Sequence, residues 1–180
     1  MSQYYYFVAS LPILALDIKP PLSLSDFLQS CEQHLSSEDY SLIRAIILNE
    51  NISSESASGV FGRWVQFNHR LRNQLAVFRA KKFNKDPAKY IRGEFEEDYH
   101  LTVMISDASR SSDPLTAEKF LDRARWAFLD ELATGYYFEF EAVMIYGLKL
   151  QMLERYQEIG SPKGRELSQE YKKIKIPAIQ

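Results

Sequence analysis

The sequence of 180 residues contains one cysteine, seven glycines and seven prolines. Because Cys31 is the sole thiol, no disulfide can form within the chain, as is typical of a reducing compartment. The scarcity of glycine and proline argues against an all-β fold, which needs many tight turns. No apolar run approaches the roughly 18 residues of a spanning helix, and no basic residue precedes the N-terminal apolar run. We therefore expect a cytoplasmic protein, with a peripheral position on the inner face of the cytoplasmic membrane left open.

Common catalytic, nucleotide-binding and metal-binding motifs are also missing. The sequence contains no HExxH, CxxC, GxxxxGK[ST] or GxGxxG. His34, His69 and His100 are scattered, and the acids at 94–98 match no EF-hand spacing. We therefore expect no enzyme, no cofactor and no metal site. The enzymatic alternative is a nucleophilic Cys31 with His34 one helical turn away, against the simpler reading of a buried small hydrophobe.

Apolar residues recur at helical spacing along most of the chain. Ser23 or Ser25, and then Ser36, are placed to cap two helices that should form an antiparallel hairpin. Further helices are expected over residues 57–84, from Asp86-Pro87 to near Gly93, from Thr116 to near Gly135, over 138–159, and in a polar stretch after Pro162. Residues 4–11 are aromatic and β-branched enough for a short strand or extended lead-in, and residues 94–114 fit a strand or a helix.

Two of these helices show which face should be buried. The inner stripe expected over 57–84 is Val60, Trp64, Phe67, Leu71, Leu75 and Phe78. The inner face expected after Thr116 is Phe120, Leu121, Ala124, Phe128, Leu129 and Leu132. Residues 140–153 are apolar nearly all round, which predicts the buried centre of the bundle.

The fold class predicted is therefore all-α, a bundle of about six or seven helices with a short extended N-terminal segment. Residues 1–180 are expected to form a single helical domain. Within it, a hairpin in residues 1–50 would pack on a bundle formed by residues 57–175.

One segment is strongly basic in a chain whose formal net charge is only −2. It carries Arg63, Arg70, Arg72, Arg79, Lys81, Lys82, Lys85, Lys89 and Arg92, with Asp86 as its only acid. Three readings stay open: a solvated helix face, a surface that docks on an acidic protein, and an RNA or phosphate contact over residues 63–92. The docking reading assigns the first seven of these cations to a partner interface.

Two segments resemble a known family. They are Tyr4-Tyr-Tyr-Phe-Val-Ala-Ser-Leu-Pro12 with Pro20-Pro21, and Phe138-Glu-Phe-Glu-Ala-Val-Met-Ile-Tyr-Gly-Leu-Lys-Leu-Gln-Met-Leu-Glu-Arg-Tyr156. Together they look like a family of uncharacterised bacterial proteins encoded among V-type ATP synthase genes in spirochaetes, chlamydiae and Bacteroidetes. That family is distantly similar to the C subunit of V/A-type ATPases, which in eukaryotes is called the d subunit. The C subunit is longer and has three related helical subdomains, so this chain corresponds to only part of it.

The resemblance implies a non-enzymatic part of an ion-transport machine. The C subunit is an all-helical socket that couples the central stalk to the membrane ring, so stalk or ring subunits of a V-type ATPase become the expected partners. No catalytic residue is carried over from the family. The alternatives are a generic helical adaptor with another partner and an RNA-binding helical protein that uses residues 63–92.

Overall fold

The computed structural model describes residues 3–50, 59–111, 113–161, 164 and 166. This part of the chain forms α1 (Tyr5–Ser10), α2 (Leu24–His34), α3 (Ser37–Leu48), α4 (Gly59–Lys82), a 3₁₀ turn η1 (Pro87–Lys89), α5 (Tyr99–Ser109), α6 (Pro114–Ala133) and α7 (Phe140–Gly160). Its β-pairing is confined to one isolated bridge, between Gln3 and Glu139. The expected all-α bundle is confirmed.

The expectation of a short strand or an extended lead-in at residues 4–11 is wrong, because residues 5–10 are helical. The backbone N–H of Tyr4 donates to the carbonyl of Phe138 at 2.6 Å, and the chain then turns into α1. Burial decides this outcome, because the ring of Phe7 is only 4% exposed and stacks on His34 at 5.0 Å. Contacts with α2 therefore override the local β-propensity. The stretch between α1 and α2 is irregular.

The helices α2 and α3 begin where the capping residues in the sequence predicted. The Oγ atoms of Ser23 and Ser36 accept backbone N–H groups of α2 and α3 at 3.0 and 3.2 Å, which settles the first cap in favour of Ser23. The ambiguous segment 94–114 is helical over α5, and Asp98 caps it by accepting the Leu101 N–H at 3.1 Å. The helix predicted from Thr116 begins earlier, at Pro114. Of the final helix expected after residue 162, residues 164 and 166 are described and are helical, and the rest lies outside the described residues.

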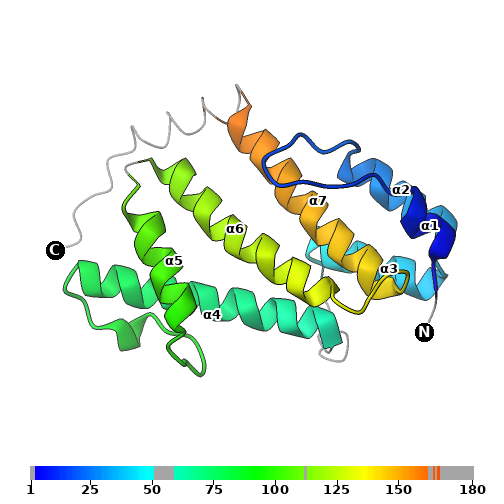
Figure 1. Ribbon diagram of the computed structural model, residues 1–180. Helices are drawn as coiled ribbons and strands as arrows, with labels where there is room; N and C mark the ends of the chain where they lie inside the picture. The colour runs from blue at the N-terminus through cyan, green and yellow to red at the C-terminus, as the bar shows by residue number, and fades with distance from the viewer. Residues whose placement is uncertain (1–2, 51–58, 112, 162–163, 165, 167–180) are drawn as a thin grey trace.

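Helices α6 and α7 lie side by side at the middle of the molecule (Figure 1). Helices α2 and α3 pack on α7, whereas α4 and α5 pack on α6. The buried side chains accordingly form two clusters, one around α7 and the N-terminal helices and the other between α4, α5 and α6. Trp64 and Phe128 contact both clusters. The prediction that α7 is a buried centre is confirmed for the first cluster, whereas the second cluster was not foreseen.

Side chains of α7 also complete the backbone hydrogen bonding of its neighbours. The carboxylate of Glu154 accepts the Leu24 N–H at the start of α2 at 2.5 Å. The amide of Gln151 donates to the carbonyl of Ile47 near the end of α3 at 2.8 Å. The first N–H groups and last carbonyls of a helix have no partner within the helix, so these bonds fix the ends of α2 and α3 on α7.

The long helix α4 buries more than its predicted stripe. Val60, Phe67 and Leu71 are buried as expected, but Asn73 is buried too because the chain after η1 returns across a second flank of the helix. The Asn73 amide donates to the Arg92 carbonyl at 2.9 Å and accepts the Arg92 N–H at 3.1 Å. The stripe residues Trp64, Leu75 and Phe78 are only half-buried.

The inner face predicted for α6 is right with one exception. Phe120 is 37% exposed, whereas the neighbouring Asp122 is completely buried. A prediction from hydrophobicity alone places Phe120 in the core and Asp122 at the surface. The reason for the reversal is a set of charged partners on α6 and α7, described below.

Gly147 marks the closest approach of α7 to α2 and α3, and it supplies a test of this packing. A Cβ built at Gly147 would lie 2.9 Å from Cε1 of Phe27 and 3.0 Å from Cδ1 of Ile47. Both neighbours are buried in the core. We expect Gly147→Val to lower the free energy of unfolding by about 1–3 kcal/mol through overpacking. Denaturant titration followed by circular dichroism measures the change.

The control is Ala127→Val, which places the same valine side chain at an exposed position of α6. That variant should stay within about 0.5 kcal/mol of the parent protein. Equal stabilities of the two variants would contradict the close approach of α7 to α2 and α3.

Candidate docking surface

All seven cations predicted to dock a partner are exposed. They are Arg63, Arg70, Arg72, Arg79 and Lys81 on α4, with Lys82 and Lys85 at and just beyond its end. Residues 59–92 carry nine basic side chains and one acid, a formal charge of +8, whereas residues 1–50 carry two basic and six acidic side chains, a formal charge of −4. The chain therefore separates its charges between α4 and the N-terminal helices.

Two of the seven cations have acidic partners within the described residues. Arg63 lies 3.8 Å from Glu131, and Lys81 lies 3.9 Å from Glu97. Both pairs are long and solvent-exposed, so they contribute little. The other five, Arg70, Arg72, Arg79, Lys82 and Lys85, form no ion pair with any part of the chain that the structure describes. We call these five the unpaired cations.

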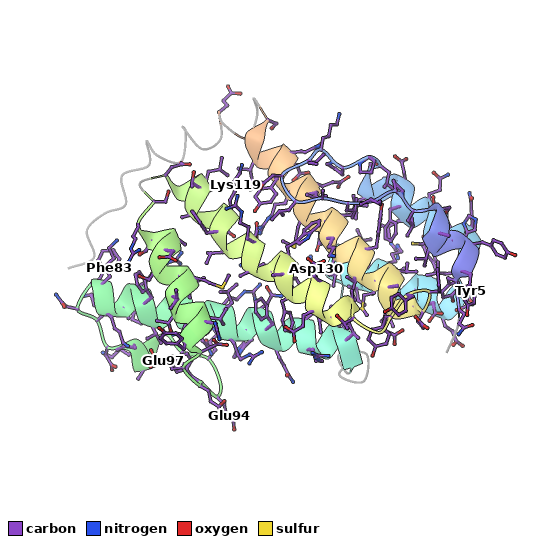
Figure 2. All side chains as sticks on the ribbon, in the orientation of Figure 1. Tyr5, Phe83, Glu94, Glu97, Lys119 and Asp130 are labelled. Carbon is purple, nitrogen blue, oxygen red and sulfur yellow. The ribbon has the colours of Figure 1, made fainter. Side chains whose placement is uncertain are left out.

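Exposed aromatic rings accompany the unpaired cations, which the sequence did not reveal. Phe83 follows the last residue of α4 and is 68% exposed, and Tyr90 follows η1 and is 51% exposed. Figure 2 shows Phe83 at one end of the molecule and Tyr5 at the other. An apolar ring beside several charges is a typical anchor at a protein interface. The C-terminal end of α4 therefore combines charge with an exposed anchor.

A pocket with a cavity of about 480 Å³ opens beside the N-terminal half of α4. Its walls come from α3, α4, α6 and α7, and three arginines line it: Arg72, Arg125 and Arg155. Arg72 therefore belongs both to the docking surface and to the pocket. Arg125 and Arg155 were not among the predicted site residues, because their neighbours become visible only once α6 and α7 are paired.

The buried Asp122 holds two of these arginines. Its carboxylate accepts hydrogen bonds from Nη1 of Arg125, on the same helix, and from Nη2 of Arg155 on α7. Glu118 is the second acid of this cluster, 3.1 Å from Arg125 and 3.6 Å from Arg155. A buried carboxylate is tolerated only when charges and hydrogen bonds compensate it. Asp122 therefore ties α6 to α7.

Two groups around Asp122, Arg155 and Tyr156 of α7, have raised pKa values. Burial acts to lower the pKa of Arg155, but the hydrogen bond and charge of Asp122 and the charge of Glu118 raise it overall. Burial, followed by the hydrogen bond and the charge of Asp122, raises the pKa of Tyr156. Both shifts favour the protonated forms, a charged Arg155 guanidinium and a neutral Tyr156 phenol.

Cys31, His34 and the acidic run at 94–98 were the other candidate functional groups, and the contacts of each are those of a structural residue. Burial raises the pKa of the Cys31 thiol to about 12, which disfavours the reactive thiolate. Nδ1 of His34 lies 2.8 Å from the Ser30 carbonyl one turn back on α2. Asp98, from the acidic run at 94–98, serves as the cap of α5. Among the described residues, no group of His, Cys, Asp and Glu is arranged to hold a metal ion.

None of the described helices is long and apolar enough to cross a membrane.

Residues 96–175 match the model of a family described as a protein of unknown function, DUF2764. The matched segment includes α5, α6 and α7, and therefore both helices that Asp122 connects. No curated protein matches the chain. No solved structure matches it either.

Replacement of Asp122 tests the link between α6 and α7. Asp122→Asn keeps the shape of the side chain but removes the charge that compensates Arg125 and Arg155. We expect the free energy of unfolding to fall by about 3–5 kcal/mol, measured by denaturant titration.

Asp130→Asn is the matched control, because Asp130 also lies on α6 and pairs with a cation of α7, Lys149. Its side chain is 58% exposed, so the loss should stay below about 1 kcal/mol. A loss for Asp122→Asn as small as that of the control would show that the buried carboxylate does not hold the two helices together.

Proposed function

We propose that the protein is a non-enzymatic adaptor of a bacterial V-type ATP synthase. It would be an accessory component, or one similar to the C subunit, that helps to couple the central stalk to the membrane ring. The observation that carries the docking part of this proposal is the set of unpaired cations on α4. The resemblance of residues 4–12, 20–21 and 138–156 to proteins encoded among V-type ATP synthase genes supplies the identity of the partners.

The contacts between these resembling segments support treating them as one unit. The Tyr4 N–H donates to the Phe138 carbonyl, and the rings of Tyr5 and Phe138 lie 4.6 Å apart. The Tyr146 hydroxyl donates to the Pro12 carbonyl at 2.9 Å. The resembling segments therefore meet at the end of the bundle that carries α1 and the start of α7 (Figure 1).

The two ends of the molecule differ in a way that suits an adaptor. The end with Tyr5 belongs to the acidic N-terminal part of the chain, and the end with Phe83 carries the basic C-terminal part of α4, where Lys81 pairs with Glu97 (Figure 2). Opposite charges at separated surfaces favour different partners, because complementary charge speeds encounter and disfavours the wrong orientation. We assign the basic end to an acidic surface of the stalk or ring. A position on the inner face of the cytoplasmic membrane would follow from this assembly.

A generic adaptor with a partner outside the ATP synthase is the nearest alternative. It would use the same unpaired cations. Isolation of the protein from native membranes separates the two, since only the first alternative recovers ATP synthase subunits.

Binding of RNA is a second candidate, and the exposure of Phe83 and Tyr90 favours it. Rings that stand among cations can stack on unpaired bases while the cations contact phosphates. Affinity for single-stranded RNA would then fall steeply with salt. Absence of binding at low salt, measured by fluorescence anisotropy, would exclude this function.

Charge reversal tests the proposed docking surface. We expect the triple variant Arg70→Glu, Arg72→Glu, Arg79→Glu to lose co-purification with ATP synthase subunits from native membranes, by about tenfold or more. The three side chains are exposed, so the fold should persist, as circular dichroism would show.

The control reverses three exposed cations outside α4: Lys19→Glu, Arg44→Glu, Arg110→Glu. It imposes the same change in net charge, and co-purification should stay near the parent level. Unchanged recovery of the α4 variant, or an equal loss for both variants, would contradict docking through α4.

A further inference from the structure

We propose that the pocket between α4 and α7 binds a small molecule through its oxyanion, a phosphate or a carboxylate. This inference rests on the pocket alone and does not depend on the proposed function. The lining contains three arginines from three helices: Arg72 from α4, Arg125 from α6 and Arg155 from α7. Arginine is the residue best suited to oxyanions, because its planar guanidinium donates paired hydrogen bonds.

The buried acids orient two of these guanidinium groups. Arg125 uses Nη1 toward Asp122 and Glu118, and Nε toward the Asn68 amide oxygen at 3.3 Å. Arg155 uses Nη2 toward the same two acids. Nη2 of Arg125 and Nη1 of Arg155 make no hydrogen bond to the described residues. The acids therefore fix both side chains and leave Nη2 of Arg125, and Nη1 and the buried Nε of Arg155, without a partner among the described residues. A fixed donor lowers the entropic cost of binding a ligand.

Arg72 provides the charge that the acids do not neutralise. It is exposed on α4 and forms no ion pair within the described part of the chain, whereas Arg125 and Arg155 share Asp122 and Glu118. Three cations and two carboxylates leave one positive charge in excess. A bound oxyanion would compensate that excess, and the partly enclosed site would strengthen the attraction relative to open solvent.

The remaining lining describes the rest of the ligand. Trp64 and Phe61 from α4 and Leu148 and Met152 from α7 give the pocket an apolar side. A volume of about 480 Å³ lies within the roughly 300–1,000 Å³ of small-molecule sites. The ligand class is therefore a compact organic phosphate or organic acid with an apolar or planar body.

The experiment compares anions on the purified full-length protein. Inorganic phosphate and succinate are titrated at an ionic strength matched with sodium chloride, and Tm is followed for the parent, Arg72→Gln and Arg79→Gln. Arg79 is the control, because it is an unpaired cation on the same helix but does not line the pocket. Both replacements are at exposed positions, so both variants should fold.

We expect phosphate or succinate to raise Tm of the parent and of Arg79→Gln by about 3–6 °C at ten times the Kd. For Arg72→Gln the Kd should rise by about tenfold or more. A response to phosphate alone assigns organic phosphates, and a response to succinate alone assigns organic acids. The proposal is overturned if neither anion exceeds sodium chloride, if Arg72→Gln responds like the parent, or if both variants lose the response equally.

Discussion

The buried carboxylate of Asp122 is the constraint on which the arrangement of the helices depends. It lies between Arg125 on α6 and Arg155 on α7, and an isolated charge there would be far too costly to bury. Helices α2 and α3 pack on α7, whereas α4 and α5 pack on α6. Each of the two helices that Asp122 connects therefore holds one half of the molecule. The ionic link, together with the apolar contacts of Leu129 and Leu132 in the first cluster, therefore sets how the two apolar clusters lie relative to each other. It also places two arginines in the wall of the pocket, so the same interaction serves stability and a candidate site.

The long helix α4 shows how one element can be anchored and still present a charged surface. Its buried flank is held by apolar packing and by buried amides, of which Asn73 bonds the returning backbone in both directions and Gln74 donates to Thr102 at 2.6 Å. The cations occupy positions that no other described element covers. Fixing a helix from one side in this way presents its charges at defined positions, which docking on another protein requires.

The sequence predicted best those features that depend on residues close together in the chain or on the properties of one side chain. The serine and aspartate caps marked the starts of α2, α3 and η1, because a capping side chain bonds N–H groups only two or three residues away. The apolar circumference of α7 correctly placed it in the core. The exposure of the seven predicted cations also follows from sequence, since isolated charges stay in water.

Long-range packing decided the features that sequence could not show. Phe7 is buried against α2, and this makes residues 5–10 helical although their composition favours a strand. Asp122 is buried because of Arg155, thirty-three residues away, and no spacing rule connects the two. The same interaction holds Arg125 and Arg155, which line the pocket. The unpaired state of Arg72 depends on which acids the fold brings near it.

Zero-length carbodiimide coupling on native membranes tests the proposed docking of the basic end of α4 on an acidic surface of the ATP synthase. This reagent joins an amine to a carboxylate in direct contact, and Lys82 and Lys85 are unpaired amines at that end. With docking through this end, we expect mass spectrometry to find cross-links from Lys82 or Lys85 to aspartates or glutamates of stalk or ring subunits. Cross-links to those subunits that come only from Lys19 or Lys119, on other parts of the surface, would contradict it.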